Sequence, residues 1–167
     1  STLFPYTTLF RSTGSMDWLP NEDALLYFAK DILGKIKQEI PTVTLTVVGR
    51  NPSRHLLQEF SRYPEIQVAG WVPDVRPYIS SHAVYIIPLR IGGGTRIKAY
   101  EALAMGKAMV STTVGVEGLP VRHGEHLEIA DTADEFASAV VALLRDTRRR
   151  TLLGNAARDF VRENFSW

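Results

Sequence analysis

The residues best suited to chemistry lie where an apolar run, Ala83 to Leu89, gives way to three consecutive glycines. Gly92, Gly93 and Gly94 carry no side chains, so an anion can approach the backbone N–H groups of this segment. Thr95 then opens a stretch with helical spacing, and the N-terminus of a helix attracts negative charge. The pattern predicts a phosphate site, and a tight strand-to-helix turn without a ligand is the simpler alternative.

Charged side chains follow the glycines and would complete such a site. Arg96 and Lys98 lie on the first two turns of the expected helix, where they would add full positive charges beside a bound nucleoside diphosphate. Glu101 lies one turn further along, and its carboxylate could accept both hydroxyl protons of a ribose. The alternative for Glu101 is an ion pair with Lys98, worth about 0.2–0.5 kcal/mol. The segment as a whole favours a nucleotide site.

The surrounding elements predict how these residues are positioned. Strands are expected at residues 43–49, 66–69, 83–89, 108–112 and 126–130, and helices at 21–40, 52–60, 75–81, 95–105, 132–144 and 148–164. Strands that alternate with helices require a parallel sheet covered on both faces. Ligands bind such sheets at the carboxyl ends of the strands, where the glycines after Leu89 are expected. Asn21 is expected to cap the first helix, and Thr132 with Glu135 forms a capping-box pattern.

Composition limits the classes of protein to consider. The chain has 167 residues, enough for one domain with a core, and its net charge of +1 provides no field for nucleic acid. It has no cysteine, which excludes disulfides and thiolate metal ligands and fits a reducing cytoplasm. The four histidines show no metal-ligand spacing, so no metal is assigned. No apolar run approaches the ~20 residues that span a bilayer, and we expect a soluble domain.

Three sequence features, in order, are similar to one enzyme family. The glycines at 92–94, the sequence Glu-Ala-Leu-Ala-Met-Gly at 101–106 and the turn Glu-Gly-Leu at 117–119 resemble the donor-binding half of GT-B glycosyltransferases of family 4, or group 1. The resemblance extends from about Gly14 to Trp167, and it is greatest for bacterial sugar transferases with a stretch like Gly-Ser-Met-Asp-Trp at 14–18. It implies a doubly wound α/β fold with a Rossmann-like parallel sheet, one half of a GT-B fold, at residues 14–167.

The resemblance implies roles for the central segment. Backbone amides at 92–95 would hold the donor diphosphate, and Arg96 and Lys98 would stabilise the leaving group. Glu101 would be the second glutamate of the family's E-x7-E motif and would bind the ribose. The helix dipole and these cations would replace a metal, so the resemblance implies a retaining, metal-independent transfer.

At other positions the sequence matches the family pattern less well. Val72 would lie in the loop whose backbone reads the base, and Trp71 beside it is expected in the core or at a domain interface. Gly14 and Glu117 would approach the donor, although a plain turn and a solvated acid explain them equally well. The first motif glutamate, which contacts the transferred sugar in many relatives, is replaced by Gly93. The basic pair that many relatives carry after the first strand is also not found there.

The implied reaction moves a sugar from a UDP- or GDP-linked donor to an acceptor without a cofactor. The acceptor-binding N-terminal domain is missing, so we expect a fragment that binds nucleotide weakly and does not turn over. The family's usual setting is bacterial polysaccharide or glycolipid assembly, with the full-length enzyme in the cytoplasm or peripheral at the inner face of the membrane. A GT-B nucleotide-sugar epimerase half and a non-catalytic nucleotide-binding module are the alternatives.

Residues 2–12 resemble the in-frame translation of a sequencing adapter. We therefore expect residues 1–13 to be a non-native N-terminus, and they are excluded from the functional interpretation. A native apolar N-terminus is the alternative. A secretory signal fits poorly, because the segment has no basic leader and no uninterrupted apolar core.

Overall fold

The computed structural model describes residues 7–92 and 96–165. Within them, six strands form one parallel sheet in the order β3-β2-β1-β4-β5-β6. The strands are β1 (Thr8–Ser15), β2 (Thr44–Arg50), β3 (Ile66–Gly70), β4 (Val84–Ile87), β5 (Met109–Ser111) and β6 (Glu128–Ile129). Strand order reverses between β1 and β4, as in a doubly wound sheet. The predicted α/β fold is confirmed.

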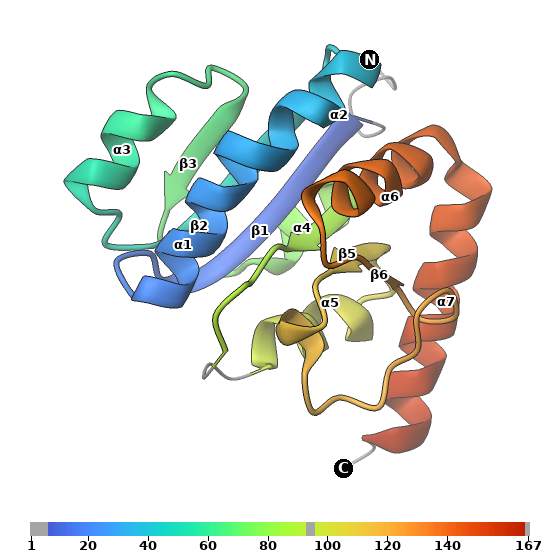
Figure 1. Cartoon of the computed structure of the whole chain (residues 1–167). Coiled ribbons are helices and arrows are strands. Elements are labelled where there is room, and N and C mark those ends of the chain that lie inside the picture. The colour runs from blue at the N-terminus through green and yellow to red at the C-terminus, as the bar shows by residue number, and fades with distance from the viewer. Residues whose placement is uncertain (1–6, 93–95, 166–167) are drawn as a thin grey trace.

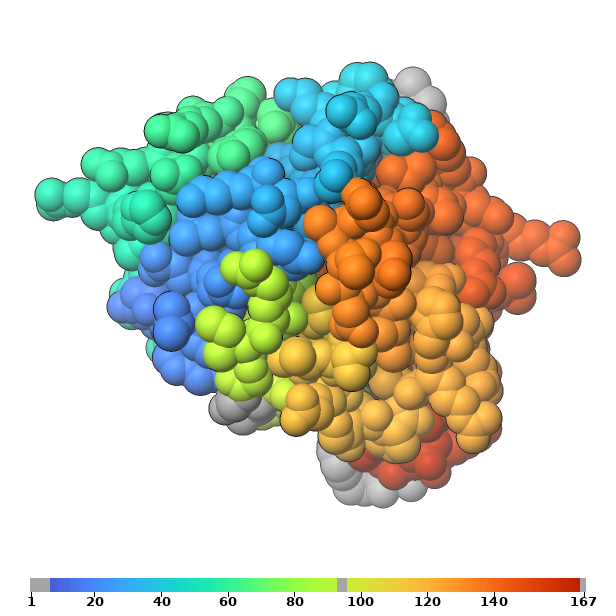
Figure 2. All heavy atoms as spheres, in the orientation of Figure 1, coloured from blue at the N-terminus to red at the C-terminus, as the bar shows by residue number. Residues whose placement is uncertain are grey.

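Helices cover both faces of the sheet, as Figure 1 shows. They are α1 (Leu19–Tyr27), a π-helical turn (Phe28–Ile32), α2 (Leu33–Glu39), α3 (Arg54–Phe60), α4 (Arg76–Ser81), α5 (Ile97–Ala104), a 3-10 turn (Val114–Val116), α6 (Ala133–Arg145) and α7 (Thr147–Asn164). Side chains of α2, α3 and α6 form one apolar core with the sheet, and those of α4, α5 and α7 form a second core. Figure 2 shows α6, in orange, directly against the cyan-blue residues of α2.

Strand β4 illustrates why this sequence builds a two-sided sheet. All its residues are buried, and they alternate between the two cores. Val84 and Ile86 join the first core, while Tyr85 and Ile87 join the second. A strand in the middle of a sheet that is covered on both faces needs such a continuous apolar run. None of the described helices is both long enough and apolar enough to cross a membrane.

The first strand lies in the middle of the sheet, although part of it was set outside the predicted domain. Strand β1 pairs with β2 on one side and with β4 on the other, in a register that places Leu9 beside Leu45 and Val84. Residues 8–13, expected to be non-native, therefore belong to the folded sheet upstream of Gly14. Their origin as adapter sequence is not addressed by the fold and stays a prediction.

The start of the first helix differs from the prediction. Asn21 does not cap it; α1 begins at Leu19 with Trp18 in the cap position, and Pro20 occupies its first turn. Proline suits that turn because its missing N–H has no helical partner to lose. The Asn21 side chain instead donates a hydrogen bond of 2.9 Å to the carbonyl oxygen of Ser15. The cap predicted at Thr132 is confirmed, since its hydroxyl accepts from the Glu135 N–H at 3.1 Å.

Candidate functional site

A cleft of about 210 Å³ opens at the carboxyl edge of the sheet, beside the point where the strand order reverses. Open α/β sheets bind ligands in this crevice, because the loops that leave its two sides diverge. The cleft is lined by the end of β1 and the loop after it, by the end of β4, by the first turn of α5 and by the loop after β5. The lining residues are Arg11, Thr13, Gly14, Ser15, Trp18, Asn21, Ile87, Leu89, Lys98, Ala99 and Gly115.

The glycines around the cleft are present for different physical reasons. A Cβ atom on Gly14 would meet no atom within 4 Å, so packing does not demand glycine there and its backbone is open to a ligand. Gly92 is similar, because its nearest neighbour would be a Val114 methyl at 3.9 Å. A Cβ on Gly115 would lie 2.7 Å from an Ile87 methyl, which real contacts do not allow. Gly115 is therefore required by packing of the loop after β5 against β4.

The first turn of α5 brings one predicted cation to the cleft. Lys98 lines it, and the Lys98 Nζ lies 3.7 Å from a carboxylate oxygen of Glu101. Both side chains are about one-third exposed, so the predicted alternative of an ion pair exists in this structure. Arg96 occupies the cap position of α5, and its Nε donates to the Glu117 carbonyl oxygen at 3.0 Å. This bond ties the start of α5 to the loop after β5.

The predicted site residues are therefore only partly brought together. Of the described ones, Gly14 and Lys98 line the cleft; Gly92, Arg96, Glu101, Glu117 and Val72 do not. Val72 is half-buried against the second core, after the end of β3. Trp71 beside it is 66% exposed, which contradicts the core alternative and leaves its place at a domain interface as a prediction. Gly93, Gly94 and Thr95, in the middle of the predicted phosphate site, lie outside the described residues.

The loops that border the cleft are held by polar contacts from several elements. The Arg90 guanidinium after β4 forms an ion pair of 2.6 Å with Asp23 of α1 and lies 4.3 Å from the Tyr27 ring centre. In Figure 2, the yellow-green segment that contains Arg90 accordingly rests on the blue residues of α1. After β5, the Thr112 hydroxyl donates to the Leu89 carbonyl oxygen at 2.5 Å. These contacts fix the ends of β4 and β5 relative to one another and to α1.

The cleft also contains polar groups that sequence reasoning missed. Arg11 of β1 is 3% exposed, and its Nε and Nη1 atoms have no hydrogen-bond partner. The Thr13 hydroxyl, also buried, has no partner either. Burial lowers the pKa of Arg11, and the nearby Tyr85 opposes this only in part. The adapter-like character of residues 2–12 hides Arg11 from the sequence prediction, and the signal that could have revealed it is a charged residue directly after Leu9 and Phe10.

Comparison with known proteins places this geometry in a family. Residues 8–146 match the family described as glycosyl transferases group 1. A 44.6 kDa protein in the cps region of Klebsiella pneumoniae is 22% identical over 157 residues, which are 89% of this chain and 40% of that protein. Among solved structures, Anabaena HepE, in complex with UDP and glucose, has a TM-score of 0.80 at 16% identity. That match covers 98% of this chain and 45% of HepE.

A second solved structure shows which part of the fold is present. The C-terminal domain of LpcC, a group 1 glycosyl transferase from Francisella tularensis, has a TM-score of 0.75 at 15% identity. The match covers 95% of this chain and 86% of that domain, whereas the chain spans less than half of HepE and of the Klebsiella protein. The fold is that of the C-terminal half of a GT-B glycosyltransferase, as the sequence predicted. With the family match extending from the first strand to the end of α6, this protein belongs to the group 1 glycosyl transferases.

Proposed function

We propose that this chain is the donor-binding half of a glycosyltransferase, which binds a nucleotide sugar and stabilises the nucleoside diphosphate that leaves during transfer. The observation that carries the proposal is the cleft at the switch point, which is lined by the open backbone of Gly14 and by Lys98 on the first turn of α5. The HepE complexes with UDP and with UDP-glucose support it, because 98% of this chain matches the fold of that protein.

The proposed chemistry is charge stabilisation. Transfer breaks the bond between the anomeric carbon of the sugar and an oxygen of the diphosphate, which leaves negative charge on the phosphate. The Lys98 ammonium, the Arg96 guanidinium and the N–H groups at the start of α5 would face that charge, together with the backbone at Gly14 and residues 92–95. Donors that are already in position need no reorganisation during the reaction, so they lower its barrier.

The finer assignments rest on the sequence. Glu101 is proposed to accept from the ribose hydroxyls, Val72 to lie near the base, and Glu117 to contact the donor through its loop. Retention of configuration, metal independence and a hexosyl donor carried by UDP or GDP belong to the same proposal. An acceptor-binding domain upstream would complete the enzyme. A relative in a cps region supports a role in polysaccharide assembly, in the cytoplasm or at the inner face of a membrane.

Thermal unfolding with nucleotides tests the proposal. UDP, GDP and ADP are added to this chain at increasing concentration; a ligand at about 100 times its Kd stabilises by roughly 2.7 kcal/mol. We expect one base to raise Tm by several degrees and Lys98→Ala to abolish most of that rise. Lys37→Ala is the matched control, because Lys37 is also half-exposed and ion-paired, 3.4 Å from Glu65, but lies on α2.

The outcomes separate the possible roles. If a nucleotide raises the Tm of Lys98→Ala as much as that of the unsubstituted chain, the nucleotide does not bind in this cleft. No rise with any of the three nucleotides, from a chain that unfolds cooperatively, would contradict donor binding by this chain. A requirement for added Mg²⁺ would contradict metal independence alone.

A further inference from the structure

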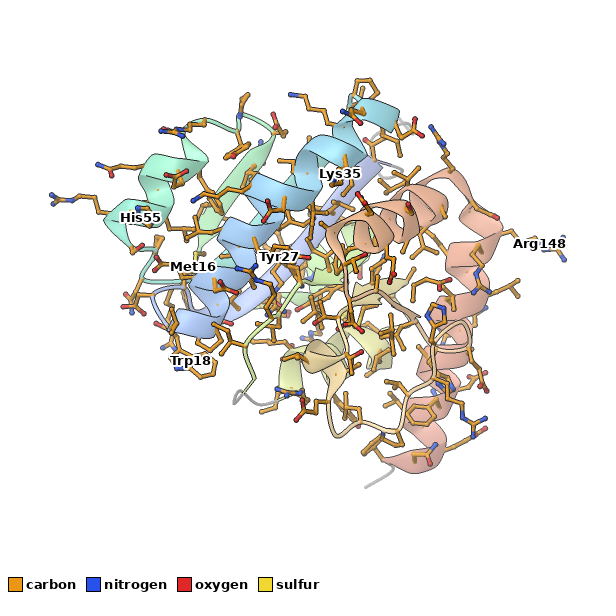
Figure 3. All side chains as sticks on the ribbon, in the orientation of Figure 1. Met16, Trp18, Tyr27, Lys35, His55 and Arg148 are labelled. Atoms are coloured by element: carbon orange, nitrogen blue, oxygen red, sulfur yellow. The ribbon has the colours of Figure 1, made fainter. Side chains whose placement is uncertain are left out.

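Trp18 is one of the residues that line the cleft, and hydrogen bonds hold its backbone in place. The Trp18 carbonyl oxygen accepts from the N–H groups of Asn21 at 2.9 Å and Glu22 at 3.0 Å, and the Trp18 N–H donates to Ser15 at 3.3 Å. These bonds fix the residue in the cap position of α1. Its side chain nevertheless stays 44% exposed, at the end of α1 nearest the carboxyl edge of β1 (Figure 3).

Trp18 supplies what the rest of the cleft lacks. Among the described residues that line it, Trp18 is the aromatic one; Lys98 and Arg11 provide charge, and Ile87 and Leu89 provide aliphatic surface. A rigid aromatic face suits a ligand with one apolar side and polar edges, since such rings combine a large contact area with a polar N–H at the rim. A pyranose ring has this character, because its axial C–H groups form an apolar face and its hydroxyls point outward.

The size and charge of the cleft indicate which part of the donor meets the indole. Its volume of about 210 Å³ is below the roughly 300–1,000 Å³ of sites that enclose a whole small molecule, so it accommodates only part of a nucleotide sugar. Lys98 and the Gly14 backbone would take the diphosphate. Glu101, one turn further along α5 and outside the cleft, would take the ribose, which leaves the phosphate that carries the sugar on the Trp18 side.

We infer that the Trp18 indole packs against the transferred sugar of the donor and thereby favours a sugar-bearing nucleotide over the bare diphosphate. The inference rests on the proposed function and deepens it by naming a residue that reads the sugar. Trp18 is a specificity-determining residue in this view; it takes no part in bond breaking.

The test compares binding of UDP with binding of UDP-glucose, UDP-galactose and UDP-N-acetylglucosamine, and GDP with GDP-mannose, by calorimetric titration of the chain. We expect Trp18→Leu to weaken binding of the preferred sugar nucleotide roughly two- to tenfold and to leave the affinity for the bare diphosphate unchanged. Trp18→Phe should keep most of the sugar contribution. Trp71→Leu is the matched control, because Trp71 is also highly exposed but follows β3 outside the cleft.

A second readout separates contact from folding. In the Trp71→Phe, Trp167→Phe double variant, Trp18 is the remaining tryptophan, and its fluorescence should change with the sugar nucleotide more than with the bare diphosphate. If Trp18→Leu weakens the affinity for the sugar nucleotide and for the bare diphosphate equally, the inference is overturned while the proposed function stands. Unchanged affinity for all sugar nucleotides would overturn it as well. If the unsubstituted chain binds none of the ligands, the proposed function fails, and the inference falls with it.

Discussion

A guanidinium is buried in the central strand β1. Arg11 leaves two nitrogen atoms without hydrogen-bond partners at 3% exposure, and its burial lowers its pKa. A buried charge without compensation destabilises a protein by several kcal/mol. A residue introduced by foreign sequence would have this property, because the neighbouring strands did not evolve to receive it.

We expect Arg11→Val to raise the stability of the chain by about 1–4 kcal/mol, because valine suits a central strand and removes a buried charge that Tyr85 offsets only in part. Thermal unfolding would show this as an increase in Tm of roughly 2–4 °C per kcal/mol for a chain of this size. Arg50→Val, at the exposed end of β2, is the control and should change Tm little. A lower Tm for Arg11→Val, together with weaker nucleotide binding, would instead make Arg11 part of the donor site.

At the scale of elements, the fold was largely predictable and the site only in part. Strands and helices followed from apolar runs and periodicity, because burial on two faces leaves a strong pattern in the sequence. The predicted start of α1 was wrong, because the preference of Pro20 for the first turn of a helix outweighed the capping preference of Asn21. Of the predicted site residues, Lys98 and Gly14 line the cleft, and their roles there stay predictions. Trp18 was missed, because exposure of an aromatic side chain depends on contacts between distant elements.

The packing of α4 on the sheet should make stability depend on pH through His82. Its Nδ1 lies 2.6 Å from the Tyr78 carbonyl oxygen and its Nε2 lies 3.1 Å from the Thr46 hydroxyl. The ring also packs 5.1 Å from that of Phe10. Burial lowers the pKa of His82, the hydrogen bond to the Tyr78 carbonyl oxygen opposes this in part, and the Lys107 charge lowers the pKa further. The folded state therefore disfavours protonation of this ring.

Because the folded pKa is below that of the unfolded chain, about 6.5, the neutral ring contributes stability above that pH. This contribution is lost as the pH falls from about 6.5 through the folded pKa. We expect the free energy of unfolding to decrease between pH 7.5 and 5.5, and to decrease less in His82→Gln. His55→Gln, on the exposed side of α3, provides the comparison. Identical pH profiles for the chain and His82→Gln, measured by urea unfolding, would exclude this role.

The whole molecule exposes large apolar side chains around the cleft. Trp18 and Leu19 follow β1, Trp71 follows β3, Ile91 follows β4, and Ile97 opens α5. All five lie at or near the carboxyl edge, where ligands bind. The Klebsiella relative and HepE are more than twice as long as the part this chain covers. We propose that an upstream half covers this edge and forms the other wall of the site.

We therefore expect the 167-residue chain to bind nucleotide but to transfer no sugar. Release of UDP from UDP-glucose, followed with simple sugars as acceptors, should stay at the rate of the buffer control. Arg96→Ala and Lys98→Ala should leave that background unchanged, because no turnover exists to lose. Turnover by the chain that Lys98→Ala reduces would show that the site is complete without an upstream half.

The position of β1 determines how long a segment must be to connect β1 to an upstream domain. The chain enters the sheet at Thr8, on the amino edge, whereas the cleft lies at the opposite edge beyond Ser15. The eight residues of β1 span about 26 Å at roughly 3.3 Å per residue. An upstream domain seated over the cleft must therefore be joined by a connector that runs back along the full depth of the sheet. Such a connector would act as a hinge, and its length would set how widely the two halves can open to exchange donor for product.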